Sequence, residues 1–159
     1  MVALKSKINN GKNMTGKVLE LFITKDDIQK TRKSVQEIEV DANGIINDKF
    51  YNKNVQRAIL ITSLESYNLS KANGIDIAQG VLGENILIDI NPYSLLSGDR
   101  LNIAGVELEI TQNCTLCKGL TTVNAKLPKL LKNDRGIFAK VISHSGTISI
   151  GDKVEILNH

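Results

Sequence analysis

Tryptophan is absent from this 159-residue sequence, and aromatic side chains make up only 4% of it. The hydrophobic core must therefore be built from isoleucine, leucine and valine, since hydrophobic residues still amount to 42% of the chain. Isoleucine and valine favour strands because branching at Cβ suits a pleated surface. This hydrophobic fraction excludes disorder of the whole chain, and the length fits one domain.

Cysteine is also scarce, with only two residues. Two cysteines do not make the disulfide scaffold of a small secreted protein. No apolar run approaches the roughly 18 residues of a membrane span, and the N-terminus lacks the apolar core of a signal peptide. We therefore expect a reduced, cytoplasmic protein that does not enter a membrane.

The net charge of +3 is too small to indicate a nucleic-acid partner. Its distribution is more informative. The stretch from Cys114 to Lys140 contains only one acidic residue, Asp134, against six basic ones: Lys118, Lys126, Lys129, Lys132, Arg135 and Lys140. The excess of positive charge therefore lies around the cysteines.

The pattern along the chain predicts one domain over residues 14–159, preceded by a flexible N-terminal tail over residues 1–13, which are polar and rich in Lys and Asn. Alternating or continuous apolar segments, typical of strands, occupy residues 17–24, 35–40, 57–62, 85–90, 100–103, 106–111, 136–143 and 147–157. The Ala104-Gly105 pair predicts a tight hairpin. Ser63 and Gly74 bracket a helix, and Pro128 can start a shorter one.

Strands outnumber helices too heavily for a doubly wound α/β fold. We therefore predict a mostly β protein, a single closed or nearly closed β-barrel with a few short peripheral helices, because closure removes exposed strand edges. Two turns repeat the same chemistry, with Gly98-Asp99 and Gly151-Asp152 each leading into an alternating strand.

The pair Cys114 and Cys117 is the only reactive-looking group of residues in the sequence. A thiolate acts as nucleophile or metal ligand, and Lys118 next to Cys117 favours the ionised form. The pattern fits a dithiol redox pair, a four-ligand zinc site completed by His144 and His159 or by the cysteines of a second subunit, or one working thiol in a basic pocket. It also fits two small apolar residues of the core.

The order of several short motifs resembles that of the MOSC domain, the module named after the C-terminal part of molybdenum cofactor sulfurases. The motifs that carry the resemblance are Gly44 to Asp48, Arg57 to Ser66, Leu82 to Ile86, Leu95 to Leu101, Leu108 to Gln112 followed by Cys117, Arg135 to Val141 and Gly146 to Val154. Together they cover about residues 15 to 157, and they are similar to the short, stand-alone members of the family.

The chain departs from the family pattern at a few positions. Phe50 stands where the family often has a histidine, and Asn47 replaces a glycine but still suits a left-handed turn. Ala58 replaces a glutamine, and Cys114 replaces an arginine. These changes bear on the ligand site rather than on the fold.

The resemblance implies a protein that binds the molybdenum cofactor, molybdopterin, or carries sulfur on Cys117 as a persulfide. Cys117 is then both the catalytic residue and the molybdenum ligand. The cofactor-binding residues are expected to be Arg57, Glu84, Asn85, Arg135 and Asp48, gathered around one mouth of the barrel. The implied activities are sulfur transfer, or a molybdenum-dependent reduction of N-hydroxylated compounds. The implied partners are a cysteine desulfurase, which would bring pyridoxal phosphate, or an electron-transfer protein.

Overall fold

A computed structural model describes residues 14–115 and 119–157 of the chain. The predicted tail over residues 1–13, the pair at 158–159, and residues 116–118, which include Cys117, lie outside the described residues. No helix within the described ranges is long and apolar enough to cross a membrane.

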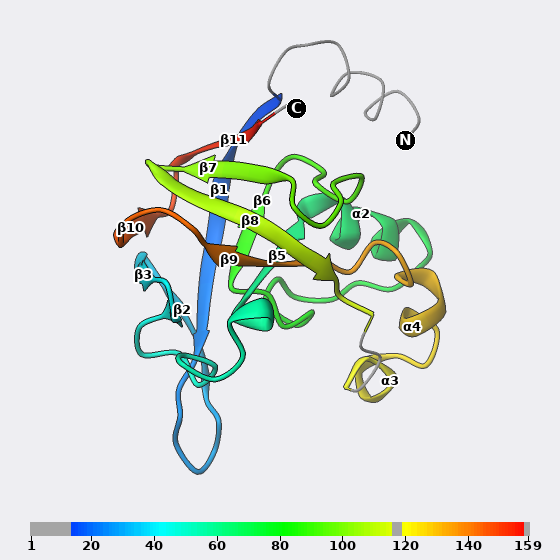
Figure 1. The fold of residues 1–159 in the computed structure, drawn as a ribbon. Helices are drawn as coiled ribbons and strands as arrows, with labels where there is room; N and C mark the ends of the chain where they lie inside the picture. The colour runs from blue at the N-terminus through cyan, green and yellow to red at the C-terminus, as the bar shows by residue number, and fades with distance from the viewer. Residues whose placement is uncertain (1–13, 116–118, 158–159) are drawn as a thin grey trace.

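Seven strands form a closed barrel (Figure 1), which confirms the predicted mostly β, closed or nearly closed barrel. In spatial order they are β11 (Lys153–Leu157), β7 (Arg100–Ile103), β8 (Val106–Asn113), β9 (Ile137–Val141), β5 (Ile59–Ser63), β6 (Ile86–Ile88) and β1 (Met14–Thr24). Pairing of β1 with β11 closes the ring, with Met14 opposite Ile156 and Lys17 opposite Lys153. Among the strand pairs of the described residues, only β5 and β6 run parallel.

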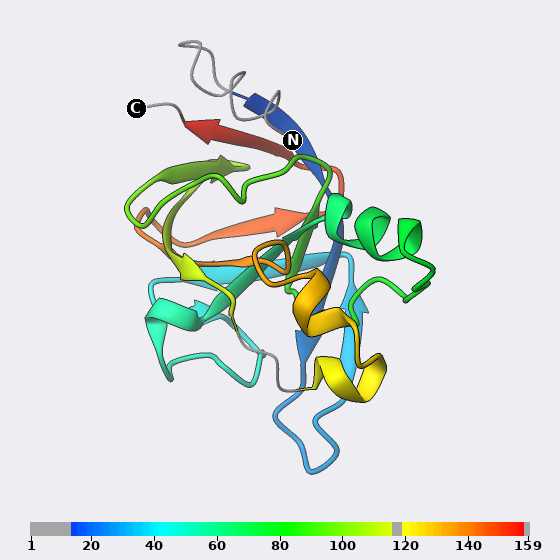
Figure 2. The ribbon, with the colours of Figure 1, turned by 90° about the vertical axis from the view of Figure 1, so that its right-hand side faces the viewer.

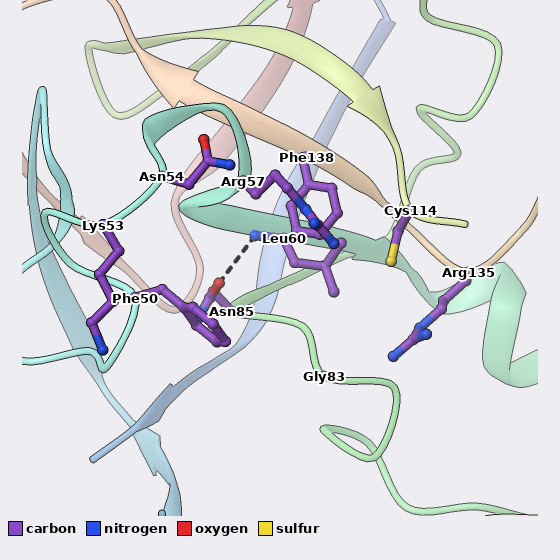
Figure 3. Close-up of a pocket in the computed structure, with 10 residues that line it drawn as sticks. All are labelled: Phe50, Lys53, Asn54, Arg57, Leu60, Gly83, Asn85, Cys114, Arg135 and Phe138. Carbon is purple, nitrogen blue, oxygen red and sulfur yellow. Dashed lines mark hydrogen bonds between the residues drawn. The ribbon is translucent and has the colours of Figure 1, made fainter. Parts of the chain in front are cut away.

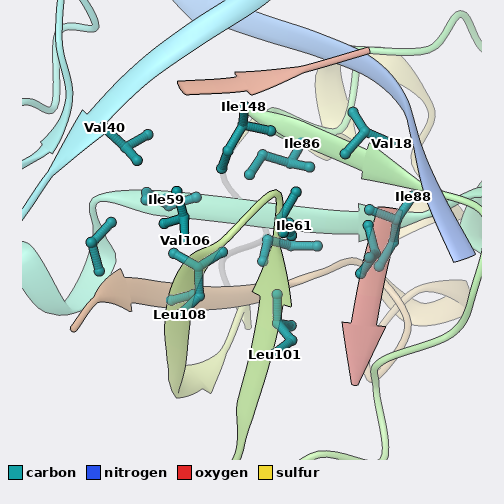
Figure 4. Packing of buried hydrophobic residues seen from close by; sticks show 14 of the residues in the cluster. Val18, Val40, Ile59, Ile61, Ile86, Ile88, Leu101, Val106, Leu108 and Ile148 are labelled. Atoms are coloured by element: carbon teal, nitrogen blue, oxygen red, sulfur yellow. The ribbon is translucent and has the colours of Figure 1, made fainter. Parts of the chain in front are cut away.

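The remaining strands extend or cover this barrel. Strand β2 (Arg32–Val35) pairs with the far half of β1. A second sheet has the order β10 (Gly146–Ser149), β3 (Glu37–Asp41) and β4 (Gly44–Ile45). Its apolar residues Ile38, Val40, Ile45 and Ile148 pack into the same core as the barrel strands. Figure 4 shows Val40 and Ile148 in this cluster.

The helices are short and lie on the outside of the barrel (Figures 1 and 2). They are the 3-10 helix η1 (Val55–Arg57) and the α-helices α2 (Leu64–Ala72), α3 (Leu120–Val123) and α4 (Leu127–Leu130). Helix α2 begins where predicted, because the Ser63 side chain accepts a hydrogen bond from the Glu65 N–H. Gly74 follows its end with φ +79°.

Local turn chemistry also agrees with the sequence. Ala104 and Gly105 both have positive φ, as a two-residue hairpin between β7 and β8 requires. The repeated Gly-Asp turns share one geometry. The Asp99 side chain accepts from the Leu96 N–H at 2.8 Å, and the Asp152 side chain accepts from the Ser149 N–H at 2.7 Å.

Strands β5, β6 and β9 are buried on both faces, one against the barrel core and the other against residues outside the barrel. The candidate site lies against the outer face of this part of the barrel wall. Ile59 and Ile61 of β5 face the barrel core, whereas Leu60 belongs to a separate cluster with Cys114 and Phe138. Likewise Leu87 of β6 packs outside the barrel, among residues of α2, α3 and α4. Side chains alternate across a strand, so Leu60 and Phe138 lie on the outer face of the wall.

Candidate functional site

A cavity of about 330 Å³ lies against this outer face (Figure 3). Its size is at the lower end of the range for small-molecule sites. The residues that line it come from η1, β5 and β9, from the loops before η1, β6 and β9, and from the position after β8: Phe50, Lys53, Asn54, Arg57, Leu60, Gly83, Asn85, Cys114, Arg135 and Phe138. It therefore lies beside the barrel wall rather than in the barrel mouth, where we expected the site.

Cys114 is held at the end of β8 by the neighbouring strand. Its N–H donates to the carbonyl of Gly136 at 2.9 Å, and the residue is only 3% exposed, packed with Leu60 and Phe138. Cys117 lies outside the described residues, three positions further along the chain. Cys114 is therefore the one thiol among the described residues that line the cavity, and the second cysteine follows shortly after it in the sequence.

Arg57 lies above the aromatic wall of the cavity. Its guanidinium carbon is 5.2 Å from the centre of the Phe138 ring, within the range of a cation–π contact. The sequence predicted that Arg57 begins the buried strand, but the strand starts at Ile59. The preceding 3-10 turn, capped by Asn54, presents Arg57 on the outer face.

Arg135 approaches from the opposite side, just before β9. Its Nε and Nη2 atoms donate to the Leu82 carbonyl at 3.2 and 3.1 Å, and Thr62 anchors its backbone by donating to the Arg135 carbonyl at 2.8 Å. Gly83 adopts a left-handed conformation with φ +91°, which favours glycine, and an added Cβ would be in ordinary van der Waals contact with the Arg135 Nη2 at 3.6 Å. Arg135 therefore both lines the cavity and fixes the loop opposite.

The side chains that line the cavity carry a net positive charge. Lys53, Arg57 and Arg135 line it, and none of the lining residues that the structure describes is a carboxylate. Phe50, Leu60 and Phe138 supply apolar walls, which lower the local dielectric and strengthen charge interactions. Such a lining favours an anionic ligand over a neutral or cationic one.

Asn85 lines the same cavity, but its amide is engaged in holding the wall together. Its Oδ1 accepts from the Leu60 N–H at 3.0 Å, and its Nδ2 donates to the Phe22 carbonyl at 3.2 Å. The side chain thus joins β5 to β1 where β6 has not yet begun. Its contribution is to the shape of the cavity.

Glu84 is completely buried and does not line the cavity. Its Oε2 accepts from the Tyr67 hydroxyl at 2.5 Å and from the Gly80 N–H at 3.1 Å. Its Oε1 has no hydrogen-bond partner within the described part of the chain. Burial raises the pKa of this carboxyl, although the Tyr67 and Gly80 hydrogen bonds oppose the shift.

Asp48 is also outside the cavity lining and is 5% exposed. Its carboxylate accepts from the Thr24 N–H at 2.8 Å and from the Phe50 N–H at 3.1 Å. Asn47 adopts the expected left-handed conformation, with φ +75°. Asp48 therefore fixes the turn that presents Phe50 to the cavity.

The structure thus brings Arg57, Asn85 and Arg135 together around Cys114, and places Glu84 and Asp48 behind the lining. Sequence reasoning did not select Phe50, Lys53, Leu60 or Phe138 as site residues. The long loop before η1 was a signal for the first two. The outward orientation of Leu60 and Phe138 depends on which face of each strand meets the core, which an all-apolar strand does not reveal.

Of the two histidines considered for a zinc site, His159 lies outside the described residues, and His144 lies far from Cys114. His144 is exposed and follows the end of β9, whereas the Cys114 N–H donates a hydrogen bond to the carbonyl of Gly136, the residue before β9. At about 3.3 Å per residue, the five residues of β9 separate these positions by roughly 16 Å. Among the described residues, no group of three or more His, Cys, Asp or Glu side chains is arranged to hold a metal ion.

Comparison with known protein families matches residues 26–155 to the MOSC domain. No match is found among curated proteins. The fold is similar to that of YuaD from Bacillus subtilis, with 21% identity, a TM-score of 0.79, and coverage of 93% of this chain and 98% of that one.

The fold is also similar to those of two YiiM proteins. The one from Geobacillus stearothermophilus has 16% identity, a TM-score of 0.69, and coverage of 89% of this chain and 75% of that one. The one from Escherichia coli has 18% identity, a TM-score of 0.68, and coverage of 92% and 71%. At such identities these three structures support the fold alone.

Proposed function

The chain belongs to the MOSC domain family, and from this membership and the cationic cavity beside Cys114 we propose that it binds the molybdenum cofactor with Cys117 as the sulfur ligand. The observation that carries the proposal is the convergence of Lys53, Arg57 and Arg135 on one cavity. That cavity is reached by the strand end that leads to Cys117.

The described residues fit the charge and chemistry of this group. Molybdopterin bears a phosphate, which lysine and arginine recognise by charge and hydrogen bonding. When bound, the group supplies a molybdenum centre for redox chemistry, and thiolate sulfur is a suitable soft ligand for such a metal.

The chain's own residues have separate tasks in this proposal. Arg57 and Lys53 attract the anionic part of the ligand, while Arg135 fixes the loop from Leu82 to Gly83 as an opposing wall. Phe50, Leu60 and Phe138 exclude water from the cavity. The adjacent Lys118 in the sequence favours the thiolate form of Cys117.

Two activities are compatible with this site. Cys117 can carry a sulfur atom as a persulfide that a pyridoxal-phosphate-dependent cysteine desulfurase supplies. Alternatively, the bound cofactor can serve the reduction of N-hydroxylated compounds with an electron-transfer partner. In both proposed activities Cys117 is the reacting residue and Arg57 binds the anionic part of the ligand.

The second candidate function is a dithiol redox or zinc site formed by Cys114 and Cys117. One observation supports it: Cys114 lines the cavity rather than the barrel core. In that case both thiols are required, whereas the cofactor proposal requires only Cys117.

The test is to produce the protein with molybdate supplied and to measure molybdenum, zinc, pterin and cysteine state on the purified chain. We expect molybdenum and pterin in the wild type, loss of at least about tenfold in Cys117→Ser because an alcohol is a poor soft-metal ligand, and retention in Cys114→Ala. Molybdenum retained by Cys117→Ser overturns the proposal. A mass increase of one sulfur atom on Cys117 without bound molybdenum identifies the sulfur carrier. A disulfide or bound zinc that is present in the wild type and lost in both variants identifies the second candidate.

A further inference from the structure

Two hydroxyl side chains that do not line the cavity reach the backbone beside Arg135. The Tyr93 hydroxyl lies 2.6 Å from Oγ of Ser66, and Oγ of Ser66 in turn contacts the carbonyl of Asp134. Neither Tyr93 nor Ser66 is among the lining residues. Because Asp134 directly precedes Arg135, this chain of hydrogen bonds ends next to a cationic residue of the cavity.

The direction of each hydrogen bond is fixed by its partners. The Asp134 carbonyl can only accept, so the single hydroxyl proton of Ser66 goes to it. Ser66 must then accept from Tyr93, and the Tyr93 oxygen itself accepts from the Ser63 N–H at 2.7 Å. Burial raises the pKa of the Tyr93 hydroxyl, which therefore remains a donor at neutral pH.

Tyr93 is held in place against helix α2. Its N–H donates to Oδ1 of Asn91 at 2.8 Å, and Nδ2 of Asn91 donates to the Glu65 carboxylate at 2.6 Å. The Tyr93 side chain also packs against the barrel core, and Ser66 is completely buried in α2. Both hydroxyl groups therefore occupy fixed places from which they can hold the segment that carries Arg135.

Three consecutive carbonyls, those of residues 134 to 136, each accept a hydrogen bond. The donors are, in that order, the Ser66 hydroxyl, the Thr62 hydroxyl at 2.8 Å and the Cys114 N–H at 2.9 Å. The segment also lies close to β5, since a Cβ on Gly136 would be 2.9 Å from Oγ1 of Thr62. The backbone here has little freedom as long as all three donors remain.

The place of this backbone decides what the Arg135 side chain can reach. Its guanidinium extends toward the loop at Gly83 (Figure 3), and its Nε and Nη2 atoms donate to the Leu82 carbonyl at 3.2 and 3.1 Å. Both distances lie in the upper part of the range for N–H···O bonds, whose most common length is about 2.9–3.0 Å. A shift of the backbone away from Leu82 would therefore break these bonds and move a positive charge of the cavity.

We propose that Tyr93 and Ser66 are positioning residues that hold the Arg135 guanidinium at the wall of the cavity and thereby raise the affinity of the cavity for an anion. The inference rests on the proposed function only in taking the ligand of the cavity to be an anion. It does not depend on Cys117 or on molybdenum. Since neither positioning residue lines the cavity, an effect on the ligand passes through Arg135.

The first measurement needs no ligand. It follows the side-chain Nε–H signal of Arg135 in NMR spectra of the full chain, identified by its absence in Arg135→Gln. In Tyr93→Phe and in Ser66→Ala we expect this signal to shift and its heteronuclear NOE to fall, because the hydrogen bond to Leu82 is loosened. Ser70→Ala is the matched control, since Ser70 carries a buried hydroxyl of the same helix that donates to a carbonyl within α2. The Arg135 signal of this control should match that of the wild type.

The second measurement titrates the same variants with inorganic phosphate and follows the amide signals of Gly83 and Cys114, which line the cavity. We expect Tyr93→Phe and Ser66→Ala each to weaken phosphate binding about three- to tenfold, which corresponds to one lost hydrogen bond. The control variant should bind phosphate like the wild type. In an Arg135→Gln background, Tyr93→Phe should cause no further loss, because the two changes remove the same interaction.

Three results would overturn the proposal: an unchanged Arg135 signal in Tyr93→Phe and Ser66→Ala, equal losses of phosphate affinity with and without Arg135, or the same changes in the control variant, which would indicate general loosening of α2. Absence of phosphate binding to the wild type would contradict the anionic ligand of the proposed function and the affinity part of this inference. The Arg135 signal would still confirm or refute the position of the guanidinium. Failure to find molybdenum on the chain would leave both measurements as they stand.

Discussion

Glu84→Gln should change how the stability of this protein depends on pH. Glu84 is fully buried behind the cavity, with one carboxylate oxygen bonded to Tyr67 and Gly80 and the other without a partner in the described structure. Burial raises the pKa of the carboxyl above its ordinary value of 4.5. The folded protein therefore keeps this proton at pH values at which the unfolded chain has released it.

The sign of the effect follows from this difference in bound protons. Between pH 4.5 and the raised pKa, the folded state holds up to one proton more than the unfolded state, so the free energy of unfolding falls as pH rises. For one group the slope approaches about 1.4 kcal/mol per pH unit. Below this window the Glu84 carboxyl is protonated in both states, so burial of a charge costs nothing. Above it the carboxyl is ionised in both states, and the free energy of unfolding no longer changes with pH through this group.

Glutamine has no titrating proton, so the variant lacks this contribution. Urea denaturation at intervals from pH 4.5 to 8 should show that the stability of the wild type, relative to Glu84→Gln, declines through the window and then becomes constant. Tyr67→Phe removes a hydrogen bond that lowers the pKa of Glu84, so it should extend the decline to higher pH. A difference between wild type and Glu84→Gln that is constant over the whole range would refute this account of Glu84.

Three further outcomes can be measured directly. Iodoacetamide should alkylate Cys117 faster than Cys114 near neutral pH, because Cys114 is only 3% exposed; faster labelling of Cys114 in peptide mass spectrometry would exclude the single-thiol mechanism. Gly80→Ala should lower the free energy of unfolding by about 1–3 kcal/mol, because the φ of +95° and the contact with Phe22 both oppose a side chain; an unchanged urea midpoint would contradict this. Asp48→Ala should destabilise the protein by about 1–3 kcal/mol, because it leaves the buried Thr24 N–H and the partly buried Phe50 N–H unpaired. Molybdenum bound per folded molecule should nevertheless remain, and its loss would make Asp48 a ligand residue.

Local chemistry in the sequence predicted much of the fold. The hairpin between β7 and β8, the start of α2 at Ser63 and the turn at Asn47 each depend on a few adjacent residues whose conformational preferences are strong. The strand β2 was missed in part, because its sequence from Arg32 to Val35 is polar and mostly exposed. It is a strand because β1 offers it an edge, and that partner is not visible in a local pattern.

The candidate site was predictable in its residues more than in its geometry. The motif order selected Arg57, Asn85 and Arg135, which the fold does bring to one cavity with Cys114. It did not distinguish side chains that face the cavity from Glu84, which turns toward Tyr67. Neighbouring residues in one short loop diverge here because hydrogen bonding to α2 and to β5 decides their orientation, and both partners are distant in the sequence.

Closure of the barrel by β1 and β11 has a consequence for how this chain reaches its native state. The two strands come from opposite ends of the domain, so the ring has no complete hydrogen-bonded circuit until nearly all of it has been synthesised. Pairings of such long range make folding slow relative to helical domains of similar size. Since β11 pairs with both β1 and β7, truncation before Lys153 would expose two strand edges at once, and unpaired edges are the sites at which β proteins aggregate.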